Sequence, residues 1–367
     1  MRVVHVIGGL GVGGAERMLQ RLLIAQAHNP EVENSVISLT TLGAIGAELE
    51  AAKIKVESLG LTNVLTLPRV LIGLVRRLRR LRPDVVQTWL YHADLLGGLA
   101  ARVARVKNIV WNIRCTVHGD SRSTNRLIRI NARLSKTVPH SIVCCGAEAM
   151  RFHQALGFRA DKMIVLPNGY DMQWLDAGAP RCHRNGVNIV MIGRNDVLKD
   201  YPNLLQAAAI VRNSGADVQF HIYGRGCPQD LALAAQVQSL DLTASVHFHD
   251  QITDIRPILR DADIFCSSSS HEGFPNVIAE AMAMGVPCVA TDAGDAAAII
   301  GNTGIIVPTK NPSALAQGLL VFSRQGAADR QQHGRAARQR ILNRYEMGHV
   351  SNLYVAHYKM LVDKSNT

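Results

Sequence analysis

Short apolar runs alternate with amphipathic segments along most of the chain. In the first half, each strand-like run is followed by a segment whose apolar residues recur every three or four positions, the spacing of one helix face. The strands predicted there are Val3–Ile7, Asn34–Leu39, Lys55–Leu59, Val85–Thr88 and Ile109–Ile113. The predicted helices are Ala15–Gln26, Gly46–Ala52, Leu71–Leu81 and Leu95–Arg105. This alternation favours a parallel sheet covered by helices on both faces.

The same rhythm restarts after residues 168–186, which are rich in turn residues and lack periodicity. The strands predicted beyond that boundary are Asn188–Ile192, Val218–Tyr223, Val246–His249, Ile264–Ser267, Pro287–Ala290 and Gly304–Val307. The predicted helices are Pro202–Arg212, Asp230–Gln238, Asn276–Met284, Arg330–Arg344 and Glu346–Val362. A chain of 367 residues is also too long for one ordinary core. We therefore expect two doubly wound α/β domains, 1–170 and 171–345, and a C-terminal helix, 346–367.

A glycine-rich loop, Gly9 to Gly14, follows the first strand and matches the dinucleotide-binding spacing G-x-G-x-x-G. A nicotinamide cofactor also needs an acidic residue at the end of the second strand, but that strand ends in Leu39-Thr40-Thr41. Gly13 and Gly14 leave backbone N–H groups at the start of a helix, where the helix dipole favours an anion. The loop is interpreted as a phosphate-binding turn, with a tight turn that binds no ligand as the alternative.

The segment 267–295 carries the most specific chemistry. Glu272 precedes a helix predicted to begin near Pro275 and to end at Gly285, and Glu280 lies on that helix. A carboxylate can accept hydrogen bonds from two sugar hydroxyls at once. The N–H groups of Gly273, Phe274 and Asn276 stand at the helix N-terminus, a favourable place for a phosphate or sugar oxygen. Two carboxylates beside a phosphate-binding turn indicate a nucleotide sugar.

The first loop of the second domain supports the same ligand. Arg194 follows a strand–glycine turn, and Lys199 comes five residues later, before a helix. Two cations at the carboxyl end of a strand suit a diphosphate leaving group, which arginine can bind bidentately.

These motifs together resemble the retaining glycosyltransferases of the GT-B fold, family 4, which build bacterial surface polysaccharides. The resemblance covers nearly the whole chain, in order: "GGLGVGGAER", "VLPNGYD" (165–171), "IGRNDVLKD", "IYGRGCPQ" (222–229) and "HEGFPNVIAEAMAMGVPCVATDAG". It implies two Rossmann-like domains facing across a cleft, with the C-terminal helix crossing back to the first domain.

By this resemblance, Arg194 and Lys199 bind the donor diphosphate, Glu280 binds the ribose hydroxyls and Glu272 holds the donor sugar. Gly14 approaches the diphosphate from the other domain. The residues expected to act in catalysis are Glu272, Arg194 and Lys199. The full donor set is Gly13, Gly14, Gly193, Arg194, Lys199, Gly224, Glu272, Gly273, Phe274, Pro275, Asn276 and Glu280.

The acceptor side is expected to use His92, Arg114 and His118. His92 follows the run "VVQTW" near the end of a predicted strand. Many family members carry a histidine where this chain has Arg114, and His118 lies four residues later. The chain also departs from the family pattern at Asp250, Asp295 and Ala298.

The net charge of +11 lies entirely in the first half of the chain. Residues 1–175 hold 23 Lys and Arg against 12 Asp and Glu, whereas residues 176–367 hold 17 of each kind. Two basic stripes contribute: residues 69–83, and a helical face with Arg122, Arg126, Arg129, Arg133 and Lys136. They favour an anionic membrane surface and a polyprenyl-diphosphate-linked or other glycan acceptor, although a charge stripe is often only a solvated face.

The sequence therefore predicts a retaining hexosyltransferase that moves a sugar from a nucleoside diphosphate donor, UDP-linked, to a lipid-linked or polysaccharide acceptor. No cofactor and no metal are expected, and Asp261 and Asp263 are interpreted as structural. Seven cysteines without paired spacing, and no apolar run long enough to span a bilayer, favour a cytoplasmic protein peripheral on the inner face of the plasma membrane. The alternatives are a sugar-nucleotide epimerase on the same fold and a basic nucleic-acid-binding protein. Proteins that bind single-stranded nucleic acid stack its bases on aromatic side chains, and only 5% of the residues here are aromatic, which counts against the nucleic-acid alternative.

Overall fold

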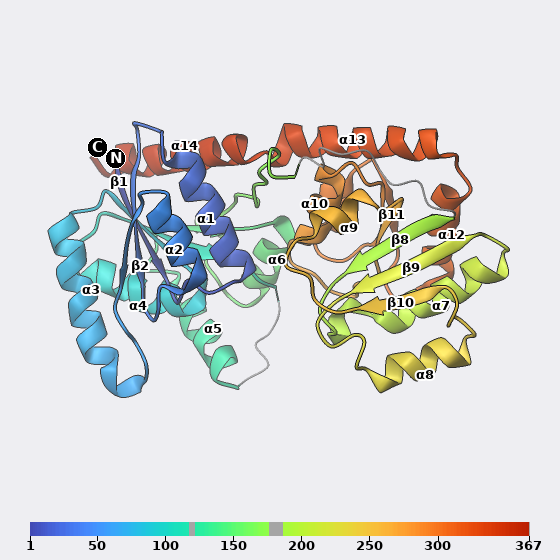
Figure 1. Cartoon of the computed structure of the whole chain (residues 1–367). Coiled ribbons are helices and arrows are strands. Elements are labelled where there is room, and N and C mark those ends of the chain that lie inside the picture. The colour runs from blue at the N-terminus through green and yellow to red at the C-terminus, as the bar shows by residue number, and fades with distance from the viewer. Residues whose placement is uncertain (117–121, 176–185, 367) are drawn as a thin grey trace. The chain divides into compact units, whose positions relative to one another are not determined.

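The computed structural model describes residues 1–116, 122–175 and 186–366 (Figure 1). The chain divides into two compact units: Met1–Gly169 with Met347–Thr367 (unit 1), and Tyr170–Glu346 (unit 2). Each unit is built on one parallel sheet. The doubly wound α/β architecture predicted from the alternation of strands and helices is confirmed.

Within its described residues, unit 1 has seven parallel strands in the order β3-β2-β1-β4-β5-β6-β7. The strands are β1 (Arg2–Ile7), β2 (Glu33–Ser38), β3 (Lys55–Ser58), β4 (Val85–Trp89), β5 (Asn108–Ile113), β6 (Ser141–Cys144) and β7 (Met163–Val165). Both β4 and β5 are buried along their whole length, because helices cover both faces of the sheet. This explains why neither strand alternates strictly between apolar and polar residues, although each also buries polar side chains such as Gln87 and Asn112.

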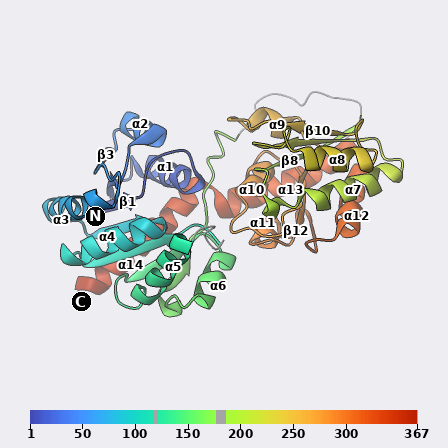
Figure 2. The same ribbon diagram turned by 90° about the horizontal axis from the view of Figure 1, so that it is seen from below.

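The helices of unit 1 form two layers around that sheet (Figure 2). One hydrophobic cluster joins β1 and β2 to α1 (Gly14–Gln26), α2 (Gly43–Ala51) and α14 (Met347–Asn366). The C-terminal helix thus packs beside α1, as Figure 1 shows. The helices α3 (Leu67–Leu81), α4 (Leu90–Val103) and α5 (Arg122–Leu134) pack against one another in that order. The remaining helical segments are η1 (Val64–Thr66), α6 (Ala147–Ala155) and η2 (Ala160–Lys162).

The described part of unit 2 repeats the plan with six parallel strands in the order β10-β9-β8-β11-β12-β13. The strands are β8 (Val187–Ile192), β9 (Val218–Tyr223), β10 (Val246–His249), β11 (Ile264–Ser267), β12 (Cys288–Thr291) and β13 (Ile305–Val307). The strand order reverses beside β8, because β9 lies on one side of it and β11 on the other. Ligands of doubly wound sheets bind beyond the strand ends at such a point.

Two hydrophobic clusters cover the two faces of this second sheet. One contains α7 (Tyr201–Asn213), α8 (Leu231–Ser239) and α12 (Pro312–Ser323). The other contains α9 (Arg256–Arg260), α10 (Asn276–Ala283), α11 (Ala296–Ile300) and α13 (Ala327–Tyr345). A short 3-10 turn, η3 (Val197–Lys199), joins β8 to α7.

Several elements differ from the sequence prediction. Strands β6 and β7 and helices α6 and α12 were not predicted. The C-terminal helix begins at Met347 rather than Glu346. Residue Lys136 lies beyond the end of α5, so that helix carries four of the five predicted basic residues.

Candidate functional site

The carboxyl ends of β8 and β9 form a turn in which backbones pass very close together. The Gly193 N–H donates to the carbonyl of Tyr223 (2.9 Å), and the Tyr201 hydroxyl donates to the carbonyl of Gly193 (2.7 Å). A Cβ atom on Gly224 would overlap the Gly193 carbonyl oxygen. The close approach of the two strand ends thus requires glycine at Gly224, whereas a Cβ atom on Gly193 would only lie tightly, 3.2 Å from the Lys199 side chain.

Lys199 and Glu272 form a half-buried ion pair at this edge of the sheet. The Lys199 Nζ lies 2.6 Å from Glu272 Oε1, and the two side chains are 22% and 16% exposed. The Ser269 hydroxyl donates to the same carboxylate oxygen at 2.7 Å. A charged pair this sheltered from water interacts more strongly than a surface pair.

Backbone contacts hold the two loops that carry this pair. Asp196 caps η3 by accepting from the Leu198 N–H (2.9 Å). The Ser268 hydroxyl donates to the carbonyl of Lys199 (2.8 Å), and the Ser270 N–H donates to the carbonyl of Leu198 (2.8 Å). The loops after β8 and β11 are thus joined, so Lys199 and Glu272 are positioned by fixed backbone rather than by free loops.

The ion pair borders a cavity of about 160 Å³. Its lining residues are Ile192, Lys199, Phe265, Ser267, Glu272, Phe274, Pro275, Asn276, Val277 and Ile278. Pro275 is the N-cap of α10, and the Asn276 side-chain oxygen accepts from the Tyr170 hydroxyl (2.8 Å). A cation, a carboxylate and a helix N-terminus therefore converge on one small space, which suits an anionic, hydroxyl-rich ligand.

The loop that carries Glu272 is supported from behind by the turn after β12. Gly294 has a φ of +61°, and a Cβ atom there would lie 2.5 Å from the carbonyl oxygens of Glu272 and Gly273. The Asp295 N–H donates to the carbonyl of Gly273 (3.1 Å). Asp295 is one of the departures from the family pattern, and its backbone N–H helps to hold the loop that carries Glu272.

Arg194 and Glu280, the other two charged residues predicted to bind the sugar donor, do not line the cavity. Arg194 has a side chain that is 79% exposed, with Asp196 Oδ2 3.8 Å away. Glu280 lies on α10 and is half-buried, but it does not border the cavity. The structure therefore brings Lys199 and Glu272 together, and places Arg194 in solvent beside them on the same loop as Lys199.

In unit 1, the predicted glycines begin the first helix. Gly13 is the extended N-cap of α1, and Gly14 is its first residue. No side chain caps this helix start. Its first N–H groups are consequently open to an acceptor supplied by a ligand or by water.

The predicted acceptor residues have different environments. Strand β4 ends at Trp89 and α4 begins at Leu90, so His92 lies in the first turn of α4, where it is exposed. The Arg114 guanidinium donates to Asn168 Oδ1 and to the Tyr354 hydroxyl, and lies 5.2 Å from the centre of the Trp89 ring. Arg114 thus links the end of β5 to α14. His118 lies outside the described residues.

A buried polar network beneath His92 was not found from the sequence. Asp94 is fully buried and accepts from the Thr88 hydroxyl (2.5 Å) and from the Asn112 N–H (3.4 Å). Burial raises the pKa of Asp94 to about 8, and the hydrogen bonds from Thr88 and Asn112 oppose that rise. Nearby, the Tyr91 hydroxyl lies 2.6 Å from His153 Nε2. The only sequence signal was an acidic residue four positions after Leu90, on an otherwise apolar helix.

We expect Asp94→Asn to flatten the pH dependence of stability. Folded Asp94 keeps a proton that the unfolded chain releases above pH 4, so the contribution of Asp94 to the free energy of unfolding falls between about pH 4 and pH 8. The fall is about 1.4 kcal/mol per pH unit, and asparagine abolishes it. Denaturant unfolding of both proteins across this range measures the difference. Parallel curves would show that Asp94 does not carry this proton.

The aspartates of the D-x-D sequence are held by the fold. Asp263 Oδ2 accepts from the Asn188 N–H (3.0 Å), and Asp263 Oδ1 lies 3.4 Å from the guanidinium of Arg330. Asp261 lies 3.5 Å from the guanidinium of Arg260. Within residues 1–116, 122–175 and 186–366, no group of three or more potential ligand side chains is placed to hold a metal ion. In the same ranges, no helix combines the length and apolar character needed to cross a bilayer.

Two family models match the chain. The model described as Glycosyltransferase Family 4 matches residues 12–174, and the model described as Glycosyl transferases group 1 matches residues 186–324. A Bacillus subtilis protein named as a glycosyltransferase, EpsF, is 25% identical over 320 residues, which cover 79% of each chain.

Two further relatives add detail. An Escherichia coli protein named UDP-Gal:alpha-D-GlcNAc-diphosphoundecaprenol alpha-1,3-galactosyltransferase is 27% identical over 245 residues, 60% of this chain and 61% of that one. The structure of Anabaena HepE in complex with UDP superposes with a TM-score of 0.82 and 19% identity, covering 98% of this chain and all of HepE.

Proposed function

Because the chain belongs to the GT-B glycosyltransferases, with a family 4 domain followed by a group 1 domain, we propose a specific reaction for it. It transfers a sugar from a UDP-linked donor to a lipid-linked glycan, with retention of configuration and without a metal ion. Unit 2 binds the donor and unit 1 binds the acceptor. The protein works as a peripheral protein at an anionic membrane surface.

The ion pair between Lys199 and Glu272 beside the α10 N-terminus is the observation that carries the donor assignment. The Lys199 ammonium and the adjacent Arg194 guanidinium meet the charge of a diphosphate leaving group. The Glu272 carboxylate accepts hydrogen bonds from sugar hydroxyls, and Glu280 accepts those of the ribose. The complex of HepE with UDP and the UDP-Gal specificity in the name of the E. coli relative support a uridine nucleotide.

The protein lowers the barrier mainly by stabilising the departing diphosphate. As the bond between the sugar C1 and the diphosphate oxygen breaks, negative charge grows on that oxygen next to Arg194 and Lys199. The acceptor hydroxyl adds to C1 on the same face, and its proton passes to the departing phosphate. Glu272 is the one carboxylate among the described residues that line the cavity, and its Oε1 contacts both Lys199 and Ser269, so we assign it to binding the sugar rather than to nucleophilic attack.

Thermal unfolding with a panel of nucleotides tests this proposal. In EDTA, at least one nucleoside diphosphate sugar should raise the midpoint of unfolding, since it binds only the folded chain, and it should do so more than the free nucleoside. Transfer should also survive EDTA, and NMR should show the donor's anomeric configuration in the product. Activity that is lost in EDTA and restored by Mg²⁺ or Mn²⁺ would contradict the metal-independent mechanism. Inversion at C1 would contradict same-face substitution.

Membrane attachment is expected to depend on the basic face of α5. Arg122, Arg126, Arg129 and Arg133 are exposed, and no described residue pairs with them. Each basic residue near an anionic leaflet contributes about 1 kcal/mol, so replacing all four by Gln should weaken attachment by orders of magnitude. Donor binding to unit 2 should stay unchanged.

Vesicle co-sedimentation at two salt concentrations measures this effect, with donor titration on the same preparation. The matched control replaces four exposed cations of unit 2, Lys310, Arg324, Arg335 and Arg344, by Gln. Equal sedimentation of the α5 variant and wild type would mean that the stripe is only a solvated face. Loss of donor binding would contradict the assignment of these arginines to the membrane.

A further inference from the structure

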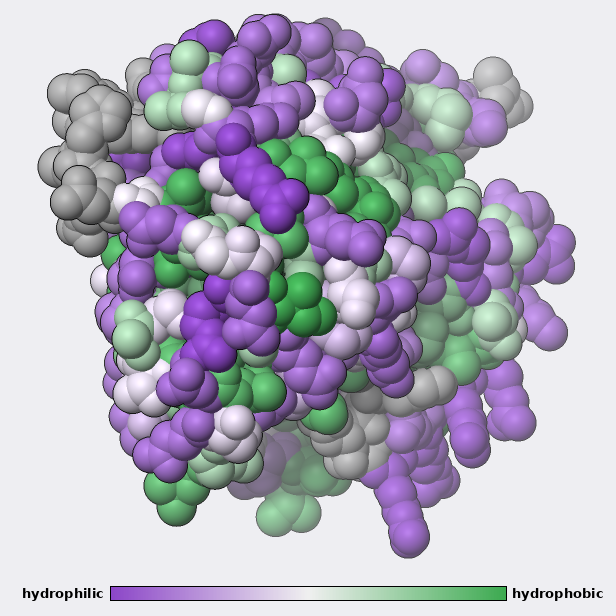
Figure 3. Space-filling view, turned by 90° about the vertical axis from the view of Figure 1, so that its right-hand side faces the viewer, coloured by the Kyte–Doolittle hydropathy of each residue, from purple (hydrophilic) through white to green (hydrophobic). Residues whose placement is uncertain are grey.

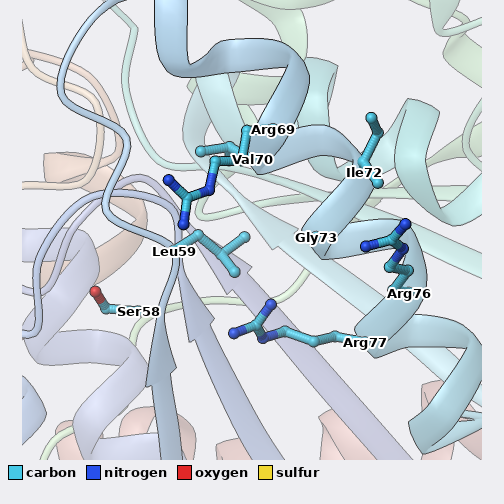
Figure 4. A pocket seen from close by; sticks show the side chains of 8 residues that line it. All are labelled: Ser58, Leu59, Arg69, Val70, Ile72, Gly73, Arg76 and Arg77. Atoms are coloured by element: carbon cyan, nitrogen blue, oxygen red, sulfur yellow. The ribbon is translucent and has the colours of Figure 1, made fainter.

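Unit 1 has a hollow between α3 and the end of β3 (Figure 4). Its volume is about 590 Å³, and it is lined by Ser58, Leu59, Arg69, Val70, Ile72, Gly73, Arg76 and Arg77. In Figure 4 the guanidinium groups of Arg69 and Arg77 extend from α3 toward Leu59 and Ser58. Three arginines therefore contribute to one concave surface.

The arginines of α3 differ in what they contact. The Arg77 guanidinium lies 2.6 Å from Glu57, and Arg80 lies 3.3 Å from the same carboxylate. Arg79 donates to the carbonyl of Val103 (3.1 Å). By contrast, Arg69 and Arg76 are exposed, and no residue in the described ranges pairs with either. The hollow thus has two uncompensated positive charges, and guanidinium groups bind phosphate oxygens bidentately.

An ordered apolar turn stands directly before this helix. Val64 and Leu65 in η1 are 82% and 91% exposed. The Asn63 side chain accepts from the N–H groups of Leu65 (3.0 Å) and Thr66 (3.2 Å), and completes a capping box with Thr66. The turn is therefore held by hydrogen bonds while it presents two adjacent apolar side chains to solvent.

These features lie together at one end of unit 1. Helices that follow parallel strands begin at the carboxyl edge of the sheet, so η1 and the start of α5 lie at the same edge, as Figure 1 shows. Figure 3 shows instead the face of unit 2 on the right-hand side of Figure 1, where hydrophilic residues predominate and apolar residues form only small patches. The hollow also lies beside the edge strand β3, whereas His92 and Arg114 follow β4 and β5, beyond β2 and β1. It is therefore separate from the proposed acceptor residues.

We propose that this hollow binds the headgroup phosphate of an anionic membrane lipid while Val64 and Leu65 insert into the apolar layer beside it. The inference rests on the proposed function, because it assumes an enzyme that works at a membrane. It adds a specific lipid site to the general attraction expected from α5. Salt screens the attraction between the α5 charges and an anionic membrane, so attachment through those charges alone is lost at high salt. Apolar insertion is not screened, so it makes part of the attachment resistant to salt.

Co-sedimentation of the full chain with phosphatidylcholine vesicles, with and without phosphatidylglycerol, tests the lipid site. Arg69→Gln with Arg76→Gln should weaken binding to phosphatidylglycerol vesicles about thirtyfold. The matched control, Arg324→Gln with Arg335→Gln on unit 2, should bind as wild type does. An equal loss in both variants, or in neither, would overturn the proposal. Displacement by inorganic phosphate as effectively as by phosphatidylglycerol vesicles would show a free-anion site and would also overturn it.

Insertion has its own readout. Val64→Ser with Leu65→Ser should remove the fraction of bound protein that resists high salt. The fluorescence added by Leu65→Trp should be quenched by lipids brominated on their acyl chains, whereas that added by Leu231→Trp, at a similarly exposed position of unit 2, should not. Persistent salt-resistant binding, or equal quenching at both positions, would overturn insertion. All these variants should still bind a nucleoside diphosphate. Nucleotide binding without lipid binding would therefore contradict the lipid site alone, whereas loss of nucleotide binding in the wild-type protein would contradict the glycosyltransferase assignment.

Discussion

Lys199→Ala should lower kcat by about a hundredfold to a thousandfold, the usual effect of removing one group that stabilises developing charge. Lys199 lies 2.6 Å from Glu272 and is the one cation among the described lining residues of the cavity. Without it, the departing diphosphate loses a charge partner, and the half-buried Glu272 carboxylate keeps only the Ser269 hydroxyl. Steady-state kinetics at saturating donor measures the change.

Two variants separate catalysis from general effects of charge. Lys55→Ala removes a lysine from an exposed ion pair with Glu33 (3.4 Å), and should leave kcat unchanged. Lys199→Arg keeps the charge and should recover part of the activity. Thermal unfolding confirms that each variant is folded. A folded Lys199→Ala enzyme with kcat within threefold of wild type would remove Lys199 from the mechanism.

Glu280→Ala should weaken binding of the nucleoside diphosphate by about thirtyfold to a hundredfold. A carboxylate that accepts from both ribose hydroxyls contributes about 2–3 kcal/mol, and each 1.4 kcal/mol is tenfold in affinity. Glu280 is half-buried on α10, whose N-terminus borders the cavity. Calorimetric titration with the nucleoside diphosphate measures the loss.

The control for Glu280 is Glu148→Ala, which removes a helical, half-buried glutamate that pairs with Arg151 (2.7 Å) in unit 1. It should bind the nucleotide as wild type does. Glu280→Gln keeps the side-chain volume and one acceptor oxygen, so its affinity should fall between those of wild type and Glu280→Ala. Unchanged affinity in a folded Glu280→Ala protein would show that this residue does not hold the ribose.

Periodicity predicted the long, well-patterned elements of the fold. Buried strands such as β1 and β8 are mostly apolar runs that are followed by glycine, and parallel strands covered on both faces have this pattern. Periodicity did not reveal elements that are short or whose pattern is interrupted. β7 contains only Met163–Val165 and merges with the following Pro-Asn-Gly turn, and α12 carries Gly318, which obscures its helical pattern.

The candidate site was predicted as a set of residues but not as an arrangement. The sequence placed Arg194, Lys199 and Glu272 near strand ends and Glu280 on the helix that follows, because residue types and turns are local. The contact between Lys199 and Glu272 joins positions 73 residues apart, and the bonds of Arg114 to Asn168 and Tyr354 join positions 54 and 240 residues apart within unit 1. Such pairings depend on how whole strands and helices pack, which a pattern along the chain does not encode.

The affinity ratio between a nucleoside diphosphate and its nucleoside tests the central claim most directly. Calorimetric titration of UDP and of uridine in EDTA should show much tighter binding of UDP, because we propose that Arg194, Lys199 and the helix N-terminus bind the diphosphate. In the double variant Arg194→Ala with Lys199→Ala, that advantage should largely disappear while uridine binding persists. Equal affinities for UDP and uridine in the wild-type protein, or an undiminished UDP advantage in the double variant, would contradict a donor site at these residues.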